Sequence, residues 1–209
     1  MTDYLNNQKL SEAVKYLSKK DKDLAELYEA NGVPPLWARP PGFTTLIKII
    51  LEQQVSLASA NSVYRKLVKN IKPFTPKRFR KLGITYLKSL GVTRQKSSYC
   101  INIAEAILDK KMDLKSLYKM NNDDAKETLI RIKGIGSWTA NIYLLMALRR
   151  SDIWPLGDIA LASSMKKIKR LRSYPDYKKQ IKIVEKWQPY RSVAARMLWQ
   201  DYLNNKTKK

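Results

Sequence analysis

The sequence predicts an all-α protein with a two-lobed helical fold. Apolar residues recur every three to four positions in almost every informative segment, whereas sustained strand-like alternation of apolar and polar residues is hard to find. Glycines, prolines and capping residues separate these segments, as expected between helices. With 209 residues, 44% of them hydrophobic, the chain is long enough to bury one ordinary core or two lobes sharing a cleft.

The N-terminal third is predicted to hold helices on both sides of a proline-rich loop. Residues 10–30 show one or two amphipathic helices that end at Asn31-Gly32, a common helix stop. Four prolines within residues 33–43 exclude regular helix there, so this stretch is predicted to be an ordered loop. A helical pattern follows over residues 43–68, with an interruption at the polar Glu52-Gln53-Gln54.

Shorter helices are predicted in the middle of the chain. One covers Tyr86 to Leu90 and ends at Gly91, and another covers Ser97 to Leu108. Asn122 is expected to cap the next helix, because its side-chain oxygen can accept from the free amides of the first turn. The two aspartates that follow it favour the positive end of the same helix.

The last third is predicted to begin with a helix that starts at Ser137 or Thr139 and runs to Leu148. This helix is apolar nearly all round, so it should be central and buried. A loop over residues 151–157 precedes a helix from Asp158 to about Leu171. A final helix is predicted over residues 192–203.

The charge of the chain points to a polyanionic partner. Lys and Arg total 41 against 18 Asp and Glu, which gives a formal charge of +23 and a pI near 10.0. Residues 1–35 are nearly neutral, and the remainder holds 36 basic and 12 acidic side chains. DNA or RNA is the favoured partner for such a surface, while a merely solvated face and anionic lipid are the alternatives.

Missing residue types exclude several kinds of chemistry. The chain has no histidine, so histidine-containing catalytic triads are excluded and proton transfer must use carboxylates, Tyr, Lys or water. Its one cysteine, Cys100, excludes an all-cysteine metal or iron–sulfur site and is expected to be a buried apolar residue. No signal peptide or membrane-spanning run is seen, so we expect no membrane partner and an intracellular protein, in the cytoplasm or nucleoid or in a eukaryotic nucleus.

A Gly-x-Gly hairpin joins two helical segments at residues 134–136. Without Cβ atoms, Gly134 and Gly136 allow a tight turn and let a ligand approach the backbone. Amides at the start of the second helix would then face one phosphate, with Lys133 adding charge beside them. By itself this pattern also fits an ordinary connection between helices.

The pattern around this hairpin is longer than the glycines, and it resembles the helix-hairpin-helix of the HhH-GPD DNA glycosylase superfamily. The branch it resembles most is that of 3-methyladenine DNA glycosylase II. Further segments look like those of the family in the same order, together spanning about residues 36–200. They are Arg39 to Phe43, Ile50 to Ser56, Gly91 with Arg94-Gln95-Lys96, Pro155-x-Gly157-Asp158, and Trp187-x-Pro189-Tyr190-Arg191-Ser192.

The resemblance implies that Asp158 is the catalytic carboxylate. It would stabilise positive charge that develops on the deoxyribose as the glycosidic bond breaks, and it would orient the attacking water. The residue also fits the N-cap of the following helix, and the two roles are compatible. In related glycosylase/lyases a lysine occupies the position of Trp138 and forms a Schiff base, so a tryptophan there implies a monofunctional enzyme.

The resemblance also implies a pocket for a base that has left the DNA stack. Its expected aromatic walls are Trp138 and Tyr190, with Trp154 a weaker candidate, and core packing is the alternative for each of them. An electron-rich wall attracts a cationic ring, which favours alkylated purines such as 3-methyladenine and 7-methylguanine. The remaining tryptophans, Trp37, Trp187 and Trp199, are expected to be core residues.

The expected DNA contacts lie in two short segments. Gln53, Gln54 and Ser56 would form the wedge that fills the gap left by the base, with Gln54 inserted and Ser56 supporting it; the alternative is a solvated helix face. The predicted phosphate-binding hairpin comprises Lys133, Gly134, Ile135, Gly136, Ser137 and Thr139. No cofactor and no iron–sulfur cluster are expected, and the family resemblance implies a structural Na⁺ or K⁺ held by the main-chain carbonyls of Ile130, Ile132 and Ile135.

Together these features predict a monomeric, monofunctional DNA glycosylase of base excision repair that acts on double-stranded DNA containing damaged bases. The alternatives are a glycosylase for oxidised or deaminated bases and a non-catalytic helix-hairpin-helix module. One lobe is expected to cover residues 43–150, and the other residues 1–42 with 151–209. The β-rich domain that precedes the helical core in some relatives is not expected here, because the first 35 residues have a helical pattern.

Overall fold

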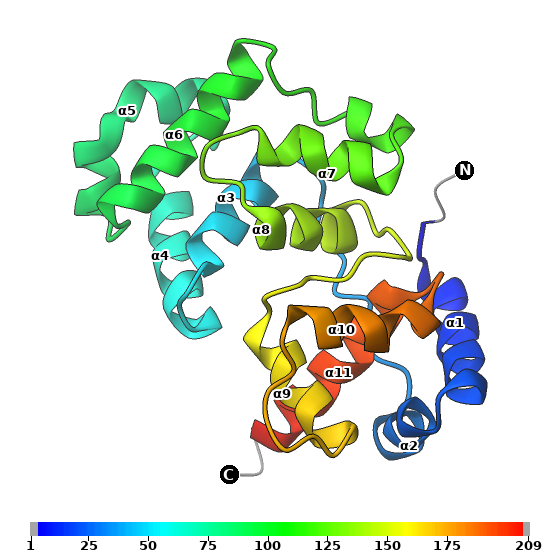
Figure 1. Cartoon of the computed structure of the whole chain (residues 1–209). Helices are drawn as coiled ribbons and strands as arrows, with labels where there is room; N and C mark the ends of the chain where they lie inside the picture. Colours follow the sequence, from blue (N-terminus) through cyan, green and yellow to red (C-terminus); the bar gives the residue numbers. More distant parts are fainter. Residues whose placement is uncertain (1–3, 207–209) are drawn as a thin grey trace. The chain divides into compact units, whose positions relative to one another are not determined.

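The computed structural model describes residues 4–206, and its regular elements are helices (Figure 1). Within this described range the only extended pairing is an isolated antiparallel bridge between Tyr4 and Arg150. The all-α prediction is confirmed. None of the helices of residues 4–206 has both the length and the apolar character needed to cross a membrane.

The chain forms two compact units. Unit 1 combines the segments Met1–Ala38 and Arg149–Lys209, and unit 2 is the continuous segment Arg39–Leu148. Unit 1 contains α1 (Asn7–Lys20), α2 (Lys22–Asn31), α9 (Ile159–Ile168), α10 (Tyr177–Val184), the short 3-10 helix η3 (Glu185–Trp187) and α11 (Arg191–Lys206).

Helix α11 forms the centre of unit 1. It packs against α1, α2, α9 and η3, and its residues Val193, Ala194, Ala195 and Leu198 are completely buried. A helix surrounded on several sides must be apolar on several faces, which explains why this segment shows almost no amphipathic pattern. It begins at Arg191 and extends to Lys206, slightly beyond the predicted residues 192–203 at both ends.

Local capping explains the two N-terminal helices. Asn6 Oδ1 accepts from the amide of Lys9 over 2.8 Å at the start of α1, and Asp21 Oδ1 accepts from the amide of Asp23 over 3.1 Å at the start of α2. Leu10 and Leu17 of α1 face the core. The helical prediction for residues 10–30 is confirmed, with Asp21 as the boundary between two helices.

Asp21 is also a buried charge that ties α2 to later parts of unit 1. Lys169 Nζ donates to both of its carboxylate oxygens, over 2.7 and 2.8 Å, and Trp187 Nε1 donates to Oδ2 over 2.7 Å. Burial alone would raise the pKa of Asp21. The hydrogen bonds and the positive charge of Lys169 and Lys186 outweigh burial and lower this pKa from 3.8 to about 2.

Unit 2 is built around α3, which is buried along most of its length. Helix α3 packs against α4, α6 and α8, and α5 lies along α6 (Figure 1). The helices of this unit are α3 (Phe43–Glu52), α4 (Leu57–Asn70), α5 (Pro76–Ser89), α6 (Arg94–Leu108), the 3-10 helix η1 (Ser116–Lys119), α7 (Asn122–Ile130), α8 (Ser137–Ile142) and the π-helical turn η2 (Tyr143–Ala147).

The predicted central helix of unit 2 is confirmed. Ala140, Leu144 and Leu145 are completely buried, and Leu148 is 1% exposed. The helical path continues from α8 into the π-helical turn, which the periodicity does not predict.

The prediction of a short helix at Tyr86 to Leu90 is wrong in extent. Helix α5 begins at Pro76, ten residues earlier, and Gly83 kinks it with φ +72°. Thr75 caps its start, accepting from the amide of Arg78 over 3.4 Å. The segment is rich in Lys and Arg, and only Phe79 and Leu87 are buried, so its apolar periodicity is too sparse to predict the full helix.

Other helix limits also differ from the prediction, and one helix is missing from it. The cap of α7 is Asn121 and not Asn122, because Asn121 Oδ1 accepts from the amide of Asp124 over 2.9 Å. Helix α9 ends at Ile168, before the predicted Leu171. Helix α10 has no counterpart in the prediction, because it buries only Gln180 and Val184.

Candidate functional site

The hairpin of unit 2 connects α7 to α8 through a tight turn in which the Ile135 amide donates to the Ile132 carbonyl over 2.9 Å. Gly136 is the N-cap of α8 and offers no side-chain cap, so the first amides of this helix have no side-chain acceptor at the cap position. Lys133 and Ser137 on either side are exposed. Such a helix start suits an anion, because its amides and its dipole both favour negative charge.

The two hairpin glycines have different surroundings. Gly134 has φ +109°, and a Cβ there would lie 2.5 Å from the ring of Tyr99, so the fold itself excludes a side chain. At Gly136 a Cβ would meet no protein atom within 4 Å. A glycine at this second position leaves the space in front of the α8 amides open to a ligand.

Two side chains of helix α6 contact the hairpin. Besides the Tyr99 ring, Asn102 Nδ2 donates to the Lys133 carbonyl over 3.3 Å. Ile135, predicted to contact phosphate, has a buried side chain, so only its backbone can do so. Thr139 is 1% exposed, and its hydroxyl accepts a hydrogen bond from within unit 2, so in this residue too only the backbone can contact a phosphate.

The donor to Thr139 is Gln53, a residue that the family resemblance assigns to the DNA wedge. Gln53 Nε2 lies 2.8 Å from Thr139 Oγ1 and 3.1 Å from the Gly134 carbonyl oxygen. Its side chain therefore braces the hairpin. These contacts join residues more than 80 positions apart in the sequence, and they give the Gln53 amide a structural role within unit 2.

Lys96 of α6 also binds the segment that contains Gln53. Its Nζ donates to the carbonyl oxygens of Leu51 and Gln53, over 2.7 Å each, where α3 ends and its last carbonyls have no helical partner. Burial lowers the pKa of Lys96, an effect that Cys100 partly opposes. Burial raises the pKa of the Cys100 thiol to about 12, which makes it an inert core residue as predicted.

Gln54 and Ser56 lie in the exposed part of this loop. Gln54 has φ +56°, a conformation that turns the chain sharply between α3 and α4. Ser56 caps α4, its Oγ accepting from the amide of Ser59 over 3.2 Å. Val55 and Leu57 are 45% and 55% exposed, so the loop presents apolar as well as polar groups.

In unit 1, Asp158 is the N-cap of α9 and is half-buried. Its Oδ1 accepts from the Leu161 amide over 3.0 Å and from Trp199 Nε1 over 3.2 Å. Trp199 is itself packed edge-to-face against Trp37, with ring centroids 6.4 Å apart. The carboxylate is thus oriented by a helix and a tryptophan, and the residue is partly exposed.

The predicted pocket aromatics have different surroundings. Trp138 of unit 2 and Tyr190 of unit 1 are both partly exposed, and Tyr190 packs edge-to-face on Tyr16 with centroids 5.3 Å apart. Trp154 is only 6% exposed and packs against Trp187, with Nε1 3.4 Å from Gln180 Oε1. Trp154 therefore belongs to the core of unit 1 and is not an open pocket wall.

Two side chains near Asp158 have roles that the sequence does not predict. Trp199 is expected to be core, which its 8% exposure confirms, but its indole N–H also reaches the carboxylate. Gly157 directly precedes Asp158 in the sequence. A Cβ on Gly157 would lie 3.3 Å from the hydroxyl of Tyr177, a residue of α10. No local pattern could have revealed either contact, because each joins segments about 20 to 40 residues apart.

The hairpin also contains the carbonyls expected to hold a monovalent cation. Ile132 O accepts the Ile135 amide, and a carbonyl oxygen has a second lone pair for a cation, so the turn is compatible with this role. Residues 4–206 contain no group of three or more His, Cys, Asp or Glu side chains able to hold a metal ion.

Comparison with known proteins identifies the family of this chain. The profile of the "HhH-GPD superfamily base excision DNA repair protein" family matches residues 47–189. The chain belongs to this superfamily. The matched range includes the hairpin, the loop of Gln53 and the Pro-x-Gly-Asp segment.

Several individual relatives are named as glycosylases of alkylated bases. A DNA-3-methyladenine glycosylase of Bacillus subtilis is 31% identical over 219 aligned positions, covering 91% of this chain and 72% of the relative. An alkylbase DNA glycosidase-like protein of Schizosaccharomyces pombe is 32% identical, covering 90% of this chain and 92% of the relative. The solved structure of a Schizosaccharomyces pombe 3-methyladenine DNA glycosylase in complex with abasic DNA has a similar fold, with a TM-score of 0.85 at 24% identity over 90% of this chain and 95% of the other.

Proposed function

We propose that this protein is a monofunctional DNA glycosylase that removes alkylated purines, of the 3-methyladenine and 7-methylguanine type, from double-stranded DNA. The observation that carries the proposal is Asp158, a half-buried carboxylate oriented by the Leu161 amide and the Trp199 indole. Relatives named for 3-methyladenine and alkylbase excision support the same chemistry.

Asp158 would act by electrostatic stabilisation. As the bond between sugar and base lengthens, positive charge develops on the deoxyribose, and a fixed carboxylate beside the ring lowers the energy of that state. Water then adds to the sugar, and Asp158 orients it. An alkylated purine already bears positive charge, so it departs without a strong general acid, which suits a chain that has no histidine.

Trp138 supports a hydrolytic mechanism without strand cleavage. An indole cannot form a Schiff base with the sugar, so the enzyme would leave an intact abasic strand. Lys133, the nearest lysine in sequence, is exposed on the hairpin and is proposed to contact a DNA phosphate.

Trp138 and Tyr190 are proposed as aromatic faces for the extruded base. Both side chains are partly exposed, unlike Trp154. Their electron-rich rings attract a cationic purine more than a neutral one, which selects for alkylation damage. This selection rests on ring electronics and requires no base-specific hydrogen bond.

The hairpin is proposed to bind one DNA phosphate through the first amides of α8, with Lys133 and Ser137 beside it. The open space in front of Gly136 gives the phosphate its approach. A monovalent cation on the carbonyls of Ile130, Ile132 and Ile135 would add positive charge at this point when bound. Gln54 is proposed as the inserted wedge, since Gln53 is occupied by the hairpin.

Binding is proposed to depend strongly on salt and to involve a single protein chain. From Gln53 to Ala104 the sequence contains eleven Lys or Arg residues and no Asp or Glu. Each phosphate neutralised by such a side chain releases counterions, so affinity falls steeply as salt rises.

The decisive experiment compares wild type and Asp158→Asn on a panel of duplexes containing alkylated, oxidised or deaminated bases. We expect wild type to release alkylpurines, and Asp158→Asn to lose at least about a hundredfold in the rate constant while DNA affinity is kept or raised. Release of only an oxidised or deaminated base would overturn the substrate assignment. If both proteins bind DNA equally and neither releases a base, the protein is a non-catalytic DNA-binding module; equal release by both would overturn the catalytic role of Asp158.

The absence of lyase chemistry has its own test. Borohydride should fail to trap the protein on abasic-site DNA, whereas a lysine-dependent lyase is trapped covalently. Efficient trapping would contradict the monofunctional mechanism.

A further inference from the structure

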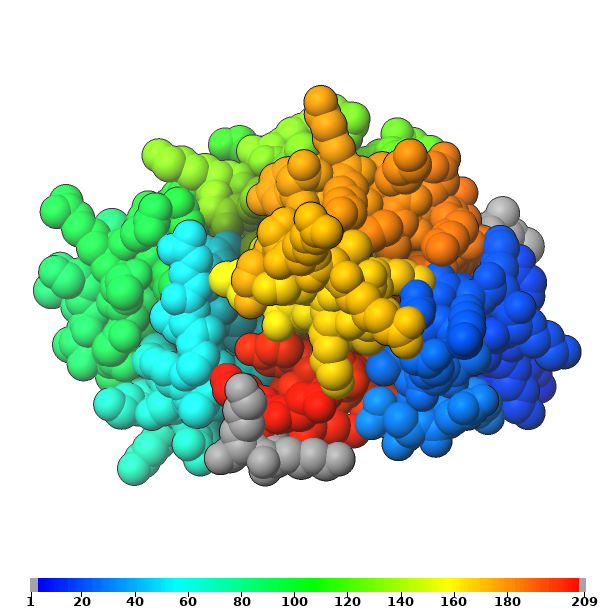
Figure 2. Space-filling view, turned by 60° about the horizontal axis from the view of Figure 1, so that its bottom comes forward, coloured from blue at the N-terminus to red at the C-terminus, as the bar shows by residue number. Residues whose placement is uncertain are grey.

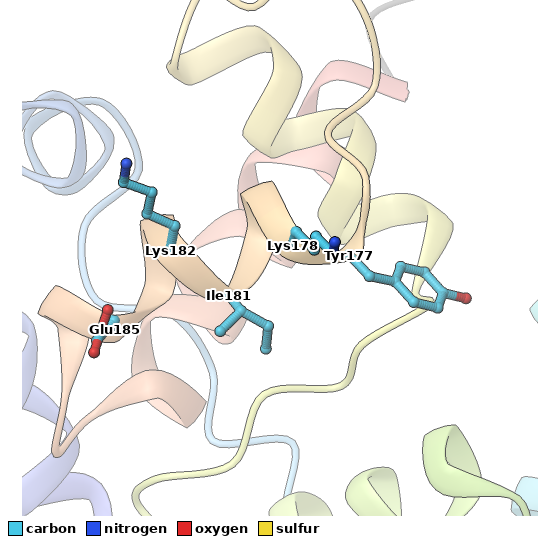
Figure 3. A pocket seen from close by; sticks show the side chains of 5 residues that line it. All are labelled: Tyr177, Lys178, Ile181, Lys182 and Glu185. Carbon is cyan, nitrogen blue, oxygen red and sulfur yellow. The ribbon is translucent and has the colours of Figure 1, made fainter.

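Helix α10 exposes large apolar side chains beside two lysines. Tyr177 is 62% and Ile181 is 47% exposed, and their spacing of four residues places them on one side of the helix. Lys178 and Lys182 have the same spacing. Together with Glu185 these residues line a hollow of about 370 Å³, and Figure 3 shows the Tyr177 ring and Ile181 projecting from the helix. We call Tyr177, Lys178, Ile181 and Lys182 the α10 face.

This face adjoins the segment that contains Asp158. The Tyr177 hydroxyl lies against Gly157, where a Cβ would be only 3.3 Å away. On the other side of Asp158 in sequence, Ile159 is 78% exposed, which is unusual for an isoleucine. The segments of α9 and α10 lie at the surface of unit 1, in yellow and orange in Figure 2. The proposed catalytic carboxylate is therefore neighboured by exposed apolar groups.

Exposed apolar groups of this size are unfavourable in water and commonly mark a binding surface. The adjacent charges indicate which partner would cover them. Lys178 and Lys182 attract phosphate, and an exposed tyrosine ring can stack on a base or pack on a sugar. Aromatic side chains interspersed with lysines are typical of surfaces that bind a nucleic acid strand.

We propose that the α10 face binds the DNA strand next to the extruded nucleotide. This inference rests on the proposed function. Tyr177 packs against a flanking base or sugar, and Lys178 and Lys182 bind the neighbouring phosphates. DNA covering Tyr177 and Ile159 also removes water from around Asp158, which strengthens the interaction of its charge with the developing positive sugar.

The first test compares Tyr177→Ala, Tyr177→Phe and Tyr174→Ala in the full chain. Tyr174 is a matched control, because it is 59% exposed in the same unit and packs under Lys166, with Nζ 5.1 Å from its ring centroid. We expect Tyr177→Ala to weaken binding to duplex DNA with a tetrahydrofuran abasic analogue about tenfold, the scale of removing one stacking interaction. Tyr177→Phe keeps the ring and should bind like wild type, as should Tyr174→Ala.

The second test measures the lysines by salt dependence. Lys178→Ser with Lys182→Ser should make the slope of log affinity against log salt less negative by about 2, because each lysine neutralises one phosphate. Lys15→Ser with Lys19→Ser removes two exposed lysines of α1 at the same spacing and should leave the slope unchanged. Specific binding by the α10 face predicts this difference, whereas a general reduction of charge predicts equal effects in both double variants.

The outcomes separate this inference from the proposed function. If wild type releases alkylpurines but Tyr177→Ala and the α10 double variant bind DNA like wild type, the α10 inference is overturned and the glycosylase remains. If wild type releases no base from any duplex, the proposed function fails, whatever the α10 variants do. Circular dichroism and thermal melting establish that each variant is folded, and a surface tyrosine offers little reason for unfolding.

Discussion

The indole N–H of Trp199 lies 3.2 Å from Asp158 Oδ1, so a side chain of α11 orients the carboxylate that caps α9. The same oxygen accepts the Leu161 amide over 3.0 Å. A carboxylate with two donors on one oxygen has little rotational freedom. This preorganisation is what electrostatic catalysis requires, because no reorganisation is then needed as charge develops.

Replacing Trp199 by Phe should therefore slow base release more than it weakens DNA binding. An aromatic ring is retained and one hydrogen bond to the carboxylate is removed, worth about 1.5 kcal/mol or roughly tenfold in the rate constant. Single-turnover kinetics with saturating enzyme measure this rate. Trp37→Phe is the control, since Trp37 packs on Trp199 but is not the Nε1 donor to Asp158. Unchanged kinetics in Trp199→Phe would mean that this hydrogen bond does not position Asp158.

Alanine substitutions of the two hairpin glycines should have different effects, one on stability and the other on DNA binding. Gly134→Ala brings a Cβ to 2.5 Å from the Tyr99 ring at φ +109°, so we expect a decrease of about 2 to 4 kcal/mol in the free energy of unfolding. Gly136→Ala meets open space and should keep wild-type stability while it weakens binding to duplex DNA. Urea denaturation and a binding titration test both claims, and equal destabilisation by the two variants would contradict them.

The adjacent glutamines of the α3–α4 loop should behave differently. Gln53→Ala removes the hydrogen bonds to the Gly134 carbonyl and Thr139, so it should lower stability by about 1 kcal/mol and weaken phosphate binding at the hairpin. Gln54→Ala should leave stability close to wild type and reduce base extrusion. Fluorescence of 2-aminopurine beside the lesion reports extrusion. Normal extrusion by Gln54→Ala would remove Gln54 from the wedge role.

Asp21 should make unit 1 sensitive to acid. Its folded pKa is about 2 and its ordinary value is 3.8, so the unfolded chain takes up the proton first as pH falls. The associated stability is present above about pH 4 and is lost as pH falls towards 2, amounting to about 2 kcal/mol. Asp21→Asn should be less stable at neutral pH and should show a shallower acid dependence.

Thermal melting between pH 2 and pH 6 measures this effect. Glu29→Gln is a matched carboxylate-to-amide control, because Glu29 is exposed on the same helix, α2. A Glu29→Gln profile as shallow as that of Asp21→Asn would show that general acid effects, and not the Lys169 and Trp187 hydrogen bonds, determine the slope.

Asp158 illustrates how much of the candidate site can be predicted from sequence. Its place after Pro155-x-Gly157 and before an amphipathic segment indicates both an N-cap and the family's carboxylate. Its hydrogen bond to Trp199 cannot be predicted, because the two residues are 41 positions apart and nothing in the intervening sequence encodes the distance. The bracing of the hairpin by Gln53 cannot be predicted for the same reason, since the partners of its amide lie on the distant hairpin.

Helices α5 and α10 illustrate the same limit for the fold. Each packs only a few apolar side chains, so the period of 3.6 residues is nearly invisible in sequence, and tertiary packing stabilises the helix. The helical run from Ala140 of α8 through η2 to Leu148, by contrast, is apolar on nearly all sides, so composition alone predicts that it is buried.

By itself the sequence determined the helical class, most of the helices and their breaks, the basic surface and the motifs of a DNA repair superfamily. These properties depend on residues within one or two helical turns, where capping and periodicity act. Tertiary structure decided which glycine is needed by the fold and which has open space in front of it, which glutamine braces the hairpin, and what holds Asp158. Those outcomes depend on atoms brought together from segments tens of residues apart, and only the packed chain sets such distances.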